Sequence, residues 1–565
     1  MYRSLTWRSA AIALALLGAG CTGELDVENP NAPDRERAFS DPATIQAVAG
    51  GSIRTWLINR QEYNGGLLIN SMADGFSASW NNFNLRYYTS EGNECPVRCG
   101  WVNNQTSSFY PQLETFWYGY YSALSGANDA LTAIRLNNVI ITDDATTRMV
   151  EAISVMIQGV VYGSIAINYD QGFIVDENTD LSNPLALPIA TREELRDAAI
   201  TKFEEAYAIA SANEFETPDT WTGLTQGVTY TSDEIARLIK TLEAQLLAHY
   251  PRNAAENGQV NWGQVATLAA AGVSSGAPFD FGFFQDLNVW YDGTKNWGND
   301  ITTMRVDTRL AAVITAGPDP AKVHKTPWPG APGNPIPDAF DDRVGNGSWG
   351  PEDDFLGAGT YAEDGGAGTD FAYASSNPFP SARGVYHYSQ LGQIRYSYLA
   401  YPGYGLPTEN GTGFAPVITA AENDLLWAEG LLRSGGSKAT AASLINNTRV
   451  GRGGLTALTG SESDAELLDA LYYEQDIELL AMGGTFYYNH RRRDALPAMT
   501  PRHMPIPAKE LALLGAELYT FGGPGNPTGM SAPVGASASK VKNVRERWAE
   551  IEKASRAEMK RRNRR

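Results

Sequence analysis

The chain has 565 residues, of which 43% are hydrophobic and 19% are charged, which is typical of a globular protein and not of a disordered one. The formal net charge is −20, but residues 540–565 carry +7 and residues 1–539 carry −27, so the acidic body repels nucleic acid. No apolar run approaches the roughly 20 residues that a bilayer crossing needs, so we expect no integral membrane protein.

The N-terminus predicts an export signal. Arg3 and Arg8 precede the short apolar run Ala10–Leu17, and small residues follow up to Cys21. A charged start, an apolar centre and small residues before a cleavage point are the parts of a signal peptide, which we assign to residues 1–20. The alternative is a buried helix beginning at residue 1, which the glycines at 18 and 20 disfavour.

Each of the three cysteines has a predicted role. Cys21 follows small residues that resemble a bacterial lipobox, which implies that Cys21 is acylated and becomes the mature N-terminus; Gly18 stands where a lipobox usually has Leu. Cys95 and Cys99 enclose a loop-like segment of an exported chain, where a disulfide is possible and the pairing stays open. A structural metal site is disfavoured, because no His or third cysteine lies nearby.

Amphipathic helices follow a polar, proline-containing tether. Apolar residues at helical spacing predict a helix after residue 41 and further helices over Leu113–Ile134 and Met149–Ile167. Three helix starts carry N-terminal capping signals: Asp41 before Pro42, Thr191 with Glu194, and Thr231 with Glu234. Such helices, joined by moderate loops, predict stacked helical hairpins.

The middle of the chain has a different texture. Residues 272–416 are rich in Gly, Pro, Asp and aromatic residues and show little helical periodicity, so we expect short strands and loops that pack on the helices and carry the binding function. Helical patterns return over 420–433, 438–449 and 463–480, and 497–507 reads as extended. The chain thus divides into a signal peptide (1–20), a lipid-anchored tether (21–39), an N-terminal helical hairpin region (40–271), a loop-rich ligand-binding region (272–416), a C-terminal helical region (417–515), and a linker with a basic helical tail (516–565).

A series of short motifs resembles those of the SusD/RagB family of outer-membrane lipoproteins. In chain order they are Leu25–Asn31 with Pro33, Trp117–Asn128, Ile167–Gly172, Leu426–Gly430, Ile445-Asn446 with Arg449, Glu474, Glu478-Leu479, Arg491-Arg492 and Met504–Pro507. Each motif is weak by itself, and the resemblance rests on their order and spacing over residues 21–515. There are departures from the family pattern: Met482-Gly483 stands for Glu-Gly, an Asp is replaced near Tyr488, and a second Arg is displaced to Arg452. Because of these departures, the sequence does not determine which of the family's salt bridges are formed.

The resemblance implies a mostly α fold, in which tetratricopeptide-like helical hairpins carry a long loop-rich insertion with short strands. It further implies a non-enzymatic, lipid-anchored outer-membrane protein, exposed at the cell surface, that binds a nutrient and delivers it to a TonB-dependent SusC-like barrel. A glycan or oligosaccharide is the expected ligand. Two alternatives stay open: a surface-anchored glycoside hydrolase and a scaffold subunit that binds only proteins.

Catalytic and metal-binding patterns are weak in this sequence. The five histidines are scattered, and no HExxH, P-loop or GxSxG element is present, so we expect no enzyme and no cofactor. A pair of glycosidase carboxylates cannot be recognised from sequence, which keeps the hydrolase alternative open. Acidic residues at 338, 341, 342 and 352–354 suggest calcium, but their spacing does not fit an EF-hand loop, so we expect no metal.

Aromatic residues beside amides and charges are the best candidates for a ligand site. Sugar rings present flat C–H faces to aromatic rings, while their hydroxyls need amide, carboxylate or Arg partners. The resemblance implies that ligand residues come from the loop after the second helix and from the middle of the chain. The candidates are Asp74, Trp80, Asn82, Arg86, Trp290, Tyr291 and Trp297. The alternative for each Trp is burial against the helices.

Overall fold

The computed structural model describes residues 41–78, 103–105, 111–219, 221, 224, 228–274, 276, 278–285, 290–299, 304–316, 341–348, 370–373, 389, 391–393, 395–396, 413–497 and 500–519. The predicted signal peptide, Cys21, the pair Cys95 and Cys99, and the basic tail lie outside these residues.

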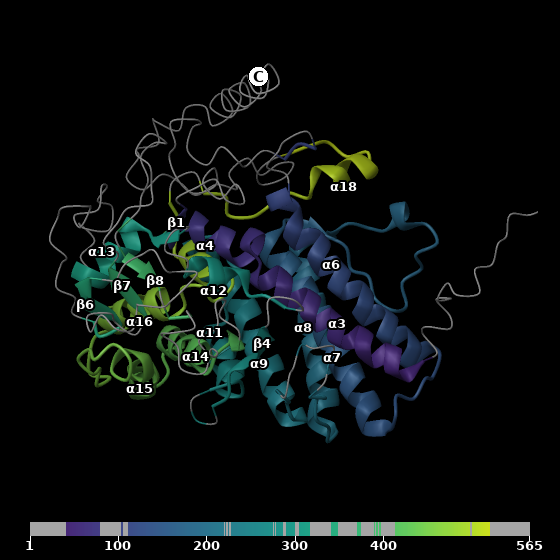
Figure 1. Ribbon diagram of the computed structural model, residues 1–565, viewed down its shortest axis with the longest axis horizontal. Coiled ribbons are helices and arrows are strands. Elements are labelled where there is room, and N and C mark those ends of the chain that lie inside the picture. Colours follow the sequence, from purple (N-terminus) through teal and green to yellow (C-terminus); the bar gives the residue numbers. More distant parts are fainter. Residues whose placement is uncertain are drawn as a thin grey trace, which may run out of the picture.

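Long helices form the N-terminal part of the fold: α3 (Pro42–Gln61), α6 (Pro111–Leu131), α7 (Asp144–Asn168), α8 (Arg192–Ala212) and α9 (Ser232–His249). Each packs against the next, and Figure 1 shows them side by side. The predicted starts are confirmed, because Asp41 accepts a hydrogen bond from the backbone N–H of Thr44 and the capping boxes at Thr191 and Thr231 are both formed. The local sequence therefore determines where these helices begin.

Helix α7 is long and apolar enough to cross a membrane by length and composition, which the sequence analysis did not recognise. Within the protein, 89% of its most apolar window is buried. It is packed between α6 and α8, and its apolar character is that of a central core helix.

Short strands come from the N-terminal helical region as well as from the middle of the chain, where they were predicted. The strands pair as β1 (Phe76–Ala78) with β5 (Met304–Val306), β2 (Gln171–Gly172) with β3 (Ala190–Thr191), β4 (Phe281–Gln285) with β9 (Gly413–Ile418), and β6 (Val344–Ser348), β7 (Phe371–Tyr373) and β8 (Leu391–Gln393) in order. Every pair is antiparallel except β6 with β7. The middle of the chain also holds helices that the sequence analysis missed, α12 (Gly293–Gly298) and α13 (Thr308–Ala316). Both are too short to show a clear helical period.

The C-terminal helices are α14 (Ala420–Ser434), α15 (Lys438–Arg449), α16 (Asp464–Glu478), α17 (Thr485–Arg492) and α18 (Ala508–Leu513). The first three follow the predicted boundaries closely, whereas α18 falls outside the predicted helices. Gly435 ends α14 in the left-handed conformation, with φ +73°, which a residue with a side chain rarely adopts. α14 also packs against α11 (Trp262–Ala270), which lies beside the short α10 (Ala254–Asn257) in the sequence. α17 was not predicted.

The three regions share one hydrophobic core within the described residues. The main cluster of buried residues includes Ile45 on α3, Phe281 on β4 and Leu511 on α18, and a small second cluster surrounds Trp262 on α11. In Figure 1 the long N-terminal helices lie on one side and α14, α15 and α16 on the other, with the short strands and α12 between them or beside the second group. The mostly helical fold with a short-strand insertion is therefore confirmed.

Candidate ligand-binding site

The two parts of the chain that were predicted to form the site do meet. β1, which follows the turn at Asp74, pairs with β5, which follows α12. Ser77 Oγ donates a hydrogen bond to Asp307 Oδ2 over 3.0 Å, and a Cβ placed on Gly298 would lie 3.1 Å from the Phe76 ring. The end of α12 is therefore packed directly against β1.

Asp74 lies at the turn that leads into β1. It has a left-handed backbone, with φ 59°, which Asp tolerates better than most residues but which still persists only when its surroundings hold it. Its backbone N–H donates to Ser71 O, and the next residue's carbonyl accepts from the N–H of Asp307. The carboxylate is buried and lies 2.8 Å from Arg309 Nη1.

Arg309 pairs with a candidate residue and was not itself among the candidates. It lies on α13, and its backbone N–H donates to Asp307 Oδ1 over 2.9 Å. Its side chain keeps 24% of its surface exposed while it pairs with the buried Asp74. Arg309, and not Asp74, is thus the member of the pair whose side chain is partly exposed to solvent. No local sequence signal marked it, because its role follows from the pairing of β1 with β5.

The three central aromatic candidates differ in exposure. Trp290 has 1% of its surface exposed and belongs to the hydrophobic core. Its environment is therefore that of a buried structural residue, which was the alternative to a ligand contact. Trp297 is partly buried and packs one side against the core, and Tyr291 is also partly exposed. Tyr291 and Trp297 therefore retain surface that a ligand can contact. Trp80, Asn82 and Arg86 lie outside the described residues.

A buried ion pair holds α12 in place. Lys295 Nζ lies 2.9 Å from Asp292 Oδ2, both side chains are fully buried, and Asp292 also caps the start of the helix. Burial lowers the pKa of Lys295, and the charge of Asp292 opposes that shift. Gln61 at the end of α3 donates to the same carboxylate over 2.9 Å. α12, with Tyr291 before it and Trp297 on it, is thus anchored to the helical body.

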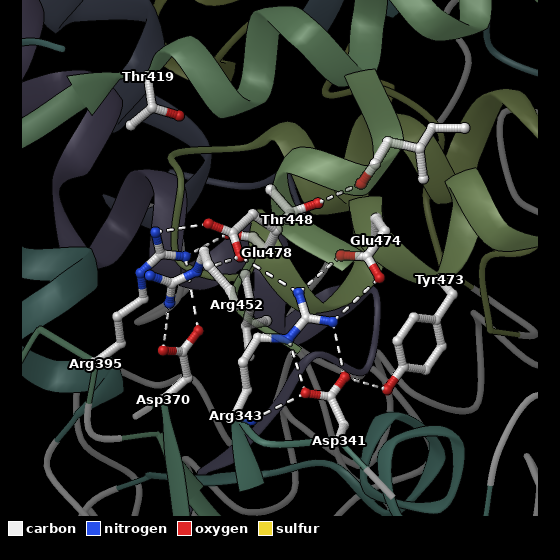
Figure 2. Close-up of polar contacts among 12 residues, drawn as sticks. Asp341, Arg343, Asp370, Arg395, Thr419, Thr448, Arg452, Tyr473, Glu474 and Glu478 are labelled. Atoms are coloured by element: carbon white, nitrogen blue, oxygen red, sulfur yellow. Dashed lines mark hydrogen bonds and ion pairs between the residues drawn. The ribbon is translucent and has the colours of Figure 1, made fainter. Parts of the chain in front are cut away.

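A second buried network anchors the loop-rich middle of the chain to α16 (Figure 2). Arg343, which immediately precedes β6, is fully buried and lies 2.7 Å from Asp341 and 2.8 Å from Glu474. It also lies 3.4 Å from Glu478. Tyr473 donates its hydroxyl to Asp341 over 2.7 Å. The contacts with Tyr473, Glu474 and Glu478 join residues more than 130 positions apart in the chain.

Two further arginines complete the network. Arg395 Nη2 lies 2.7 Å from Glu478 Oε1, and Arg452 Nε lies 2.9 Å from Glu478 Oε2. Both arginines also pair with Asp370, which precedes β7. Burial by itself would raise the pKa of Glu478, but the three arginines outweigh it and hold that pKa at about 2. Arg452, displaced from its position in the family pattern, therefore still forms ion pairs.

Other family-like motifs among the described residues also make internal contacts. Arg492 forms a fully buried pair with Glu429 at 2.5 Å, and Arg491 donates to the backbone carbonyls of Ile167 and His249. Tyr488 donates to Asn168 Oδ1 over 3.0 Å. These motifs hold the C-terminal helices against α7 and α9, so they act in the scaffold and not in a solvent-facing site.

The acidic residues considered for calcium include Asp341, whose two oxygens accept from Arg343 and Tyr473. Among the residues that the structure describes, no group of three or more His, Cys, Asp or Glu side chains has the arrangement of a metal site. The acidic residues at 338 and 352–354 lie outside that part of the chain. Asp341 belongs to the ion network.

Comparisons with known proteins identify the fold. No protein-family model matches the sequence, and no curated protein matches it either. The structure is similar to a SusD-like carbohydrate-binding protein from Bacteroides fragilis, with 14% identity, a TM-score of 0.52, and coverage of 82% of this chain and 90% of that chain. It is similar to a SusD superfamily protein from Bacteroides thetaiotaomicron, with 10% identity, a TM-score of 0.52, and coverage of 84% and 93%. A SusD-like carbohydrate-binding protein from Bacteroides vulgatus matches with 14% identity, a TM-score of 0.50, and coverage of 82% and 86%.

At such low identity the likeness concerns the arrangement of the backbone, and function must be argued from the site. The matches extend over most of this chain and most of each neighbour. The chain therefore has the SusD-like fold that its series of motifs predicted.

Proposed function

We propose that the protein is a surface lipoprotein that binds a glycan and passes it to a TonB-dependent SusC-like barrel. The observation that carries the proposal is the likeness to SusD-like carbohydrate-binding proteins over more than four fifths of the chain. The position of the candidate residues supports it, because the Asp74–Arg309 pair lies at the β1–β5 junction, against which α12 is packed.

The exposed chemistry of this area suits a sugar. Tyr291 and Trp297 offer partly exposed rings, and Arg309 offers guanidinium N–H groups held in place by Asp74. An aromatic face with adjacent charged donors matches the apolar faces and the hydroxyls of a pyranose. Asp74 contributes by fixing Arg309. Trp80, Asn82 and Arg86 stay in the proposal as ligand residues of the segment that continues from β1.

Ligand binding tests the proposal directly. Trp297→Ala and Arg309→Met are each expected to weaken oligosaccharide binding about 10-fold, because an aromatic contact contributes about 0.5–1.5 kcal/mol and a hydrogen bond to a charged group about 1.5–3 kcal/mol. Isothermal titration calorimetry of the purified protein against a panel of oligosaccharides measures the change. Trp427→Ala is the matched control, since Trp427 is also partly buried but lies on α14.

Three results would decide against this assignment. Unchanged affinity in both site variants, for a sugar that the wild type binds, would place the ligand elsewhere. Release of shorter sugars during incubation with the wild type would favour the glycoside hydrolase alternative. Binding of a transporter barrel without binding of any sugar would favour the protein-only scaffold.

Membrane attachment is a separate part of the proposal. Cys21 follows Gly18-Ala19-Gly20 at the end of the predicted signal peptide, so Cys21→Ser is expected to move the protein from the membrane fraction to the soluble periplasmic fraction. The wild type is expected to co-purify with a large outer-membrane barrel after mild detergent extraction. Cys95→Ser is the control, because it removes a thiol without touching the anchor. Unaltered fractionation of Cys21→Ser would refute the lipoprotein assignment.

A further inference from the structure

A small cavity lies inside the helical body, apart from the candidate sugar site. It has about 50 Å³ of free space and is lined by residues of α3, α6, α7, α8, α9 and the start of α17. Aromatic and aliphatic side chains form much of its wall, among them Trp56, Phe116 and Leu242. The polar groups on the wall include Arg60, Gln245 and His249. The cavity is far smaller than the roughly 300–1,000 Å³ of ordinary small-molecule sites, so it excludes a sugar ring.

The buried wall atoms that lack hydrogen-bond partners are all donors. They are Nε and Nη2 of Arg60 and Nε2 of Gln245. Gln245 has only 4% of its surface exposed, and the Arg60 side chain has 16%. No Asp or Glu is among the described residues of the wall. A buried donor without a hydrogen-bond partner lowers the stability of the fold. Waters can accept hydrogen bonds from these donors, but they do not neutralise the charge of the Arg60 guanidinium.

The carboxylate nearest to Arg60 neutralises it poorly. Glu422 Oε1 is 3.9 Å from Arg60 Nη2, beyond hydrogen-bond distance, and it accepts instead from the Thr485 hydroxyl at 2.7 Å. Gln245 lies beside Glu422, but its Nε2 makes no hydrogen bond of normal geometry. Burial raises the pKa of Glu422, and Arg60 opposes that shift. The negative charge of Glu422 is therefore a weak partner for the guanidinium.

The other polar groups of the wall are neutral or already engaged. Burial, together with Arg492 and Arg60, lowers the pKa of His249 well below its usual value, so the imidazole is uncharged at neutral pH. Tyr488 donates its hydroxyl to Asn168 Oδ1, and Tyr120 and Ser164 are neutral. Arg60 is thus the one formal charge among the described wall residues, and Arg60 and Gln245, which carry the donors without hydrogen-bond partners, both line this space.

We propose that this cavity binds a small monovalent anion of the halide class, held by the Arg60 guanidinium and the Gln245 amide. One water occupies roughly 10–15 Å³ of such space, so the cavity has room for one halide and a small number of waters. The anion supplies the counter-charge that Glu422 supplies poorly. It stabilises the end of α3 where Gln61, the next residue, holds Asp292 of α12.

Bromide provides a direct test with the whole protein. Crystals soaked in sodium bromide are expected to show an anomalous peak in the cavity, within contact distance of Arg60 Nε or Nη2. In solution, the Tm is expected to be about 1–3 °C higher in sodium chloride or bromide than in sodium gluconate at the same ionic strength, because the ligand binds the folded state only.

Variants separate this site from general salt effects. Arg60→Met is expected to abolish the halide-dependent Tm shift, and Gln245→Leu is expected to weaken it. Arg196→Met is the matched control, since Arg196 lies on α8 with a partly exposed side chain paired to Asp197, and it is expected to keep the full shift. If Arg60→Met does not fold, Gln245→Leu and the bromide peak of the wild type still test the proposal.

Three outcomes would overturn the assignment. The first is a cavity that contains only waters in the bromide-soaked crystal. The second is a halide-dependent Tm shift that persists unchanged in the folded Arg60→Met or Gln245→Leu variant. The third is an anomalous peak without any Tm shift, which would mean an adventitious ion only. Failure of sugar binding at Trp297 and Arg309 would leave this site unaffected.

Discussion

Replacing Arg343 with methionine is expected to lower the free energy of unfolding by about 3–5 kcal/mol, because it leaves buried carboxylates without their partner. Arg343 is fully buried and contacts Asp341, Glu474 and Glu478 (Figure 2). Methionine fills much of the same space, so the loss arises mainly from the uncompensated charges. Urea unfolding followed by circular dichroism measures the free energy, and hydrogen exchange of residues 341–348 and 391–396 reports whether the insertion separates from α16.

Arg452→Met provides the matched control within the same network. Arg452 also contacts Glu478, but its side chain is 29% exposed, and Arg395 continues to pair with both Glu478 and Asp370. We therefore expect a loss of only about 1 kcal/mol. Equal losses for Arg343→Met and Arg452→Met would show that burial does not determine the strength of the network.

The same network predicts a pH dependence through Glu478. The folded pKa is about 2 and the ordinary value is 4.5, so the ionised form is favoured in the folded state. The contribution of Glu478 to stability is therefore fully present above about pH 4.5 and is lost as the pH falls towards 2. The difference in stability between wild type and Arg343→Met should shrink over that interval.

Replacing Trp290 with alanine is expected to cost about 3–5 kcal/mol of stability, because the ring has 1% of its surface exposed and belongs to the main hydrophobic cluster. Trp297→Ala is expected to cost clearly less, because the Trp297 ring is only partly buried. The two variants are a matched comparison, because Trp290 lies just before α12 and Trp297 lies on it. Thermal and urea unfolding of the two variants measure the difference.

The ligand data complete that comparison. We expect Trp297→Ala to reduce sugar affinity while it changes the Tm little, and Trp290→Ala to change the Tm strongly. If Trp290→Ala instead left stability intact and removed binding, the ring would face the ligand and not the core. If both substitutions only lowered stability, α12 would be a structural element without a part in binding.

The sequence by itself determined the helical scaffold. Capping residues such as Asp41, Thr191 and Thr231 act on backbone groups within one turn, so their effect can be recognised from neighbouring residues. The boundaries of α14, α15 and α16 follow the same local rules. The order of the short motifs predicted the SusD-like fold, and some of their residues, such as Arg491, join the C-terminal helices to α7 and α9.

Only the tertiary structure decided which side chains are buried and which charges pair. Trp290 and Trp297 are only seven positions apart, yet Trp290 lies in the core and Trp297 retains exposed surface. Their exposure depends on which distant segments pack against α12. Arg309 joins the candidate site through the pairing of β1 with β5, more than 200 residues apart. The Arg343 network and the unpaired donors of Arg60 likewise depend on distant segments. Capping acts over one helical turn, whereas burial and ion pairing depend on the packing of the whole chain.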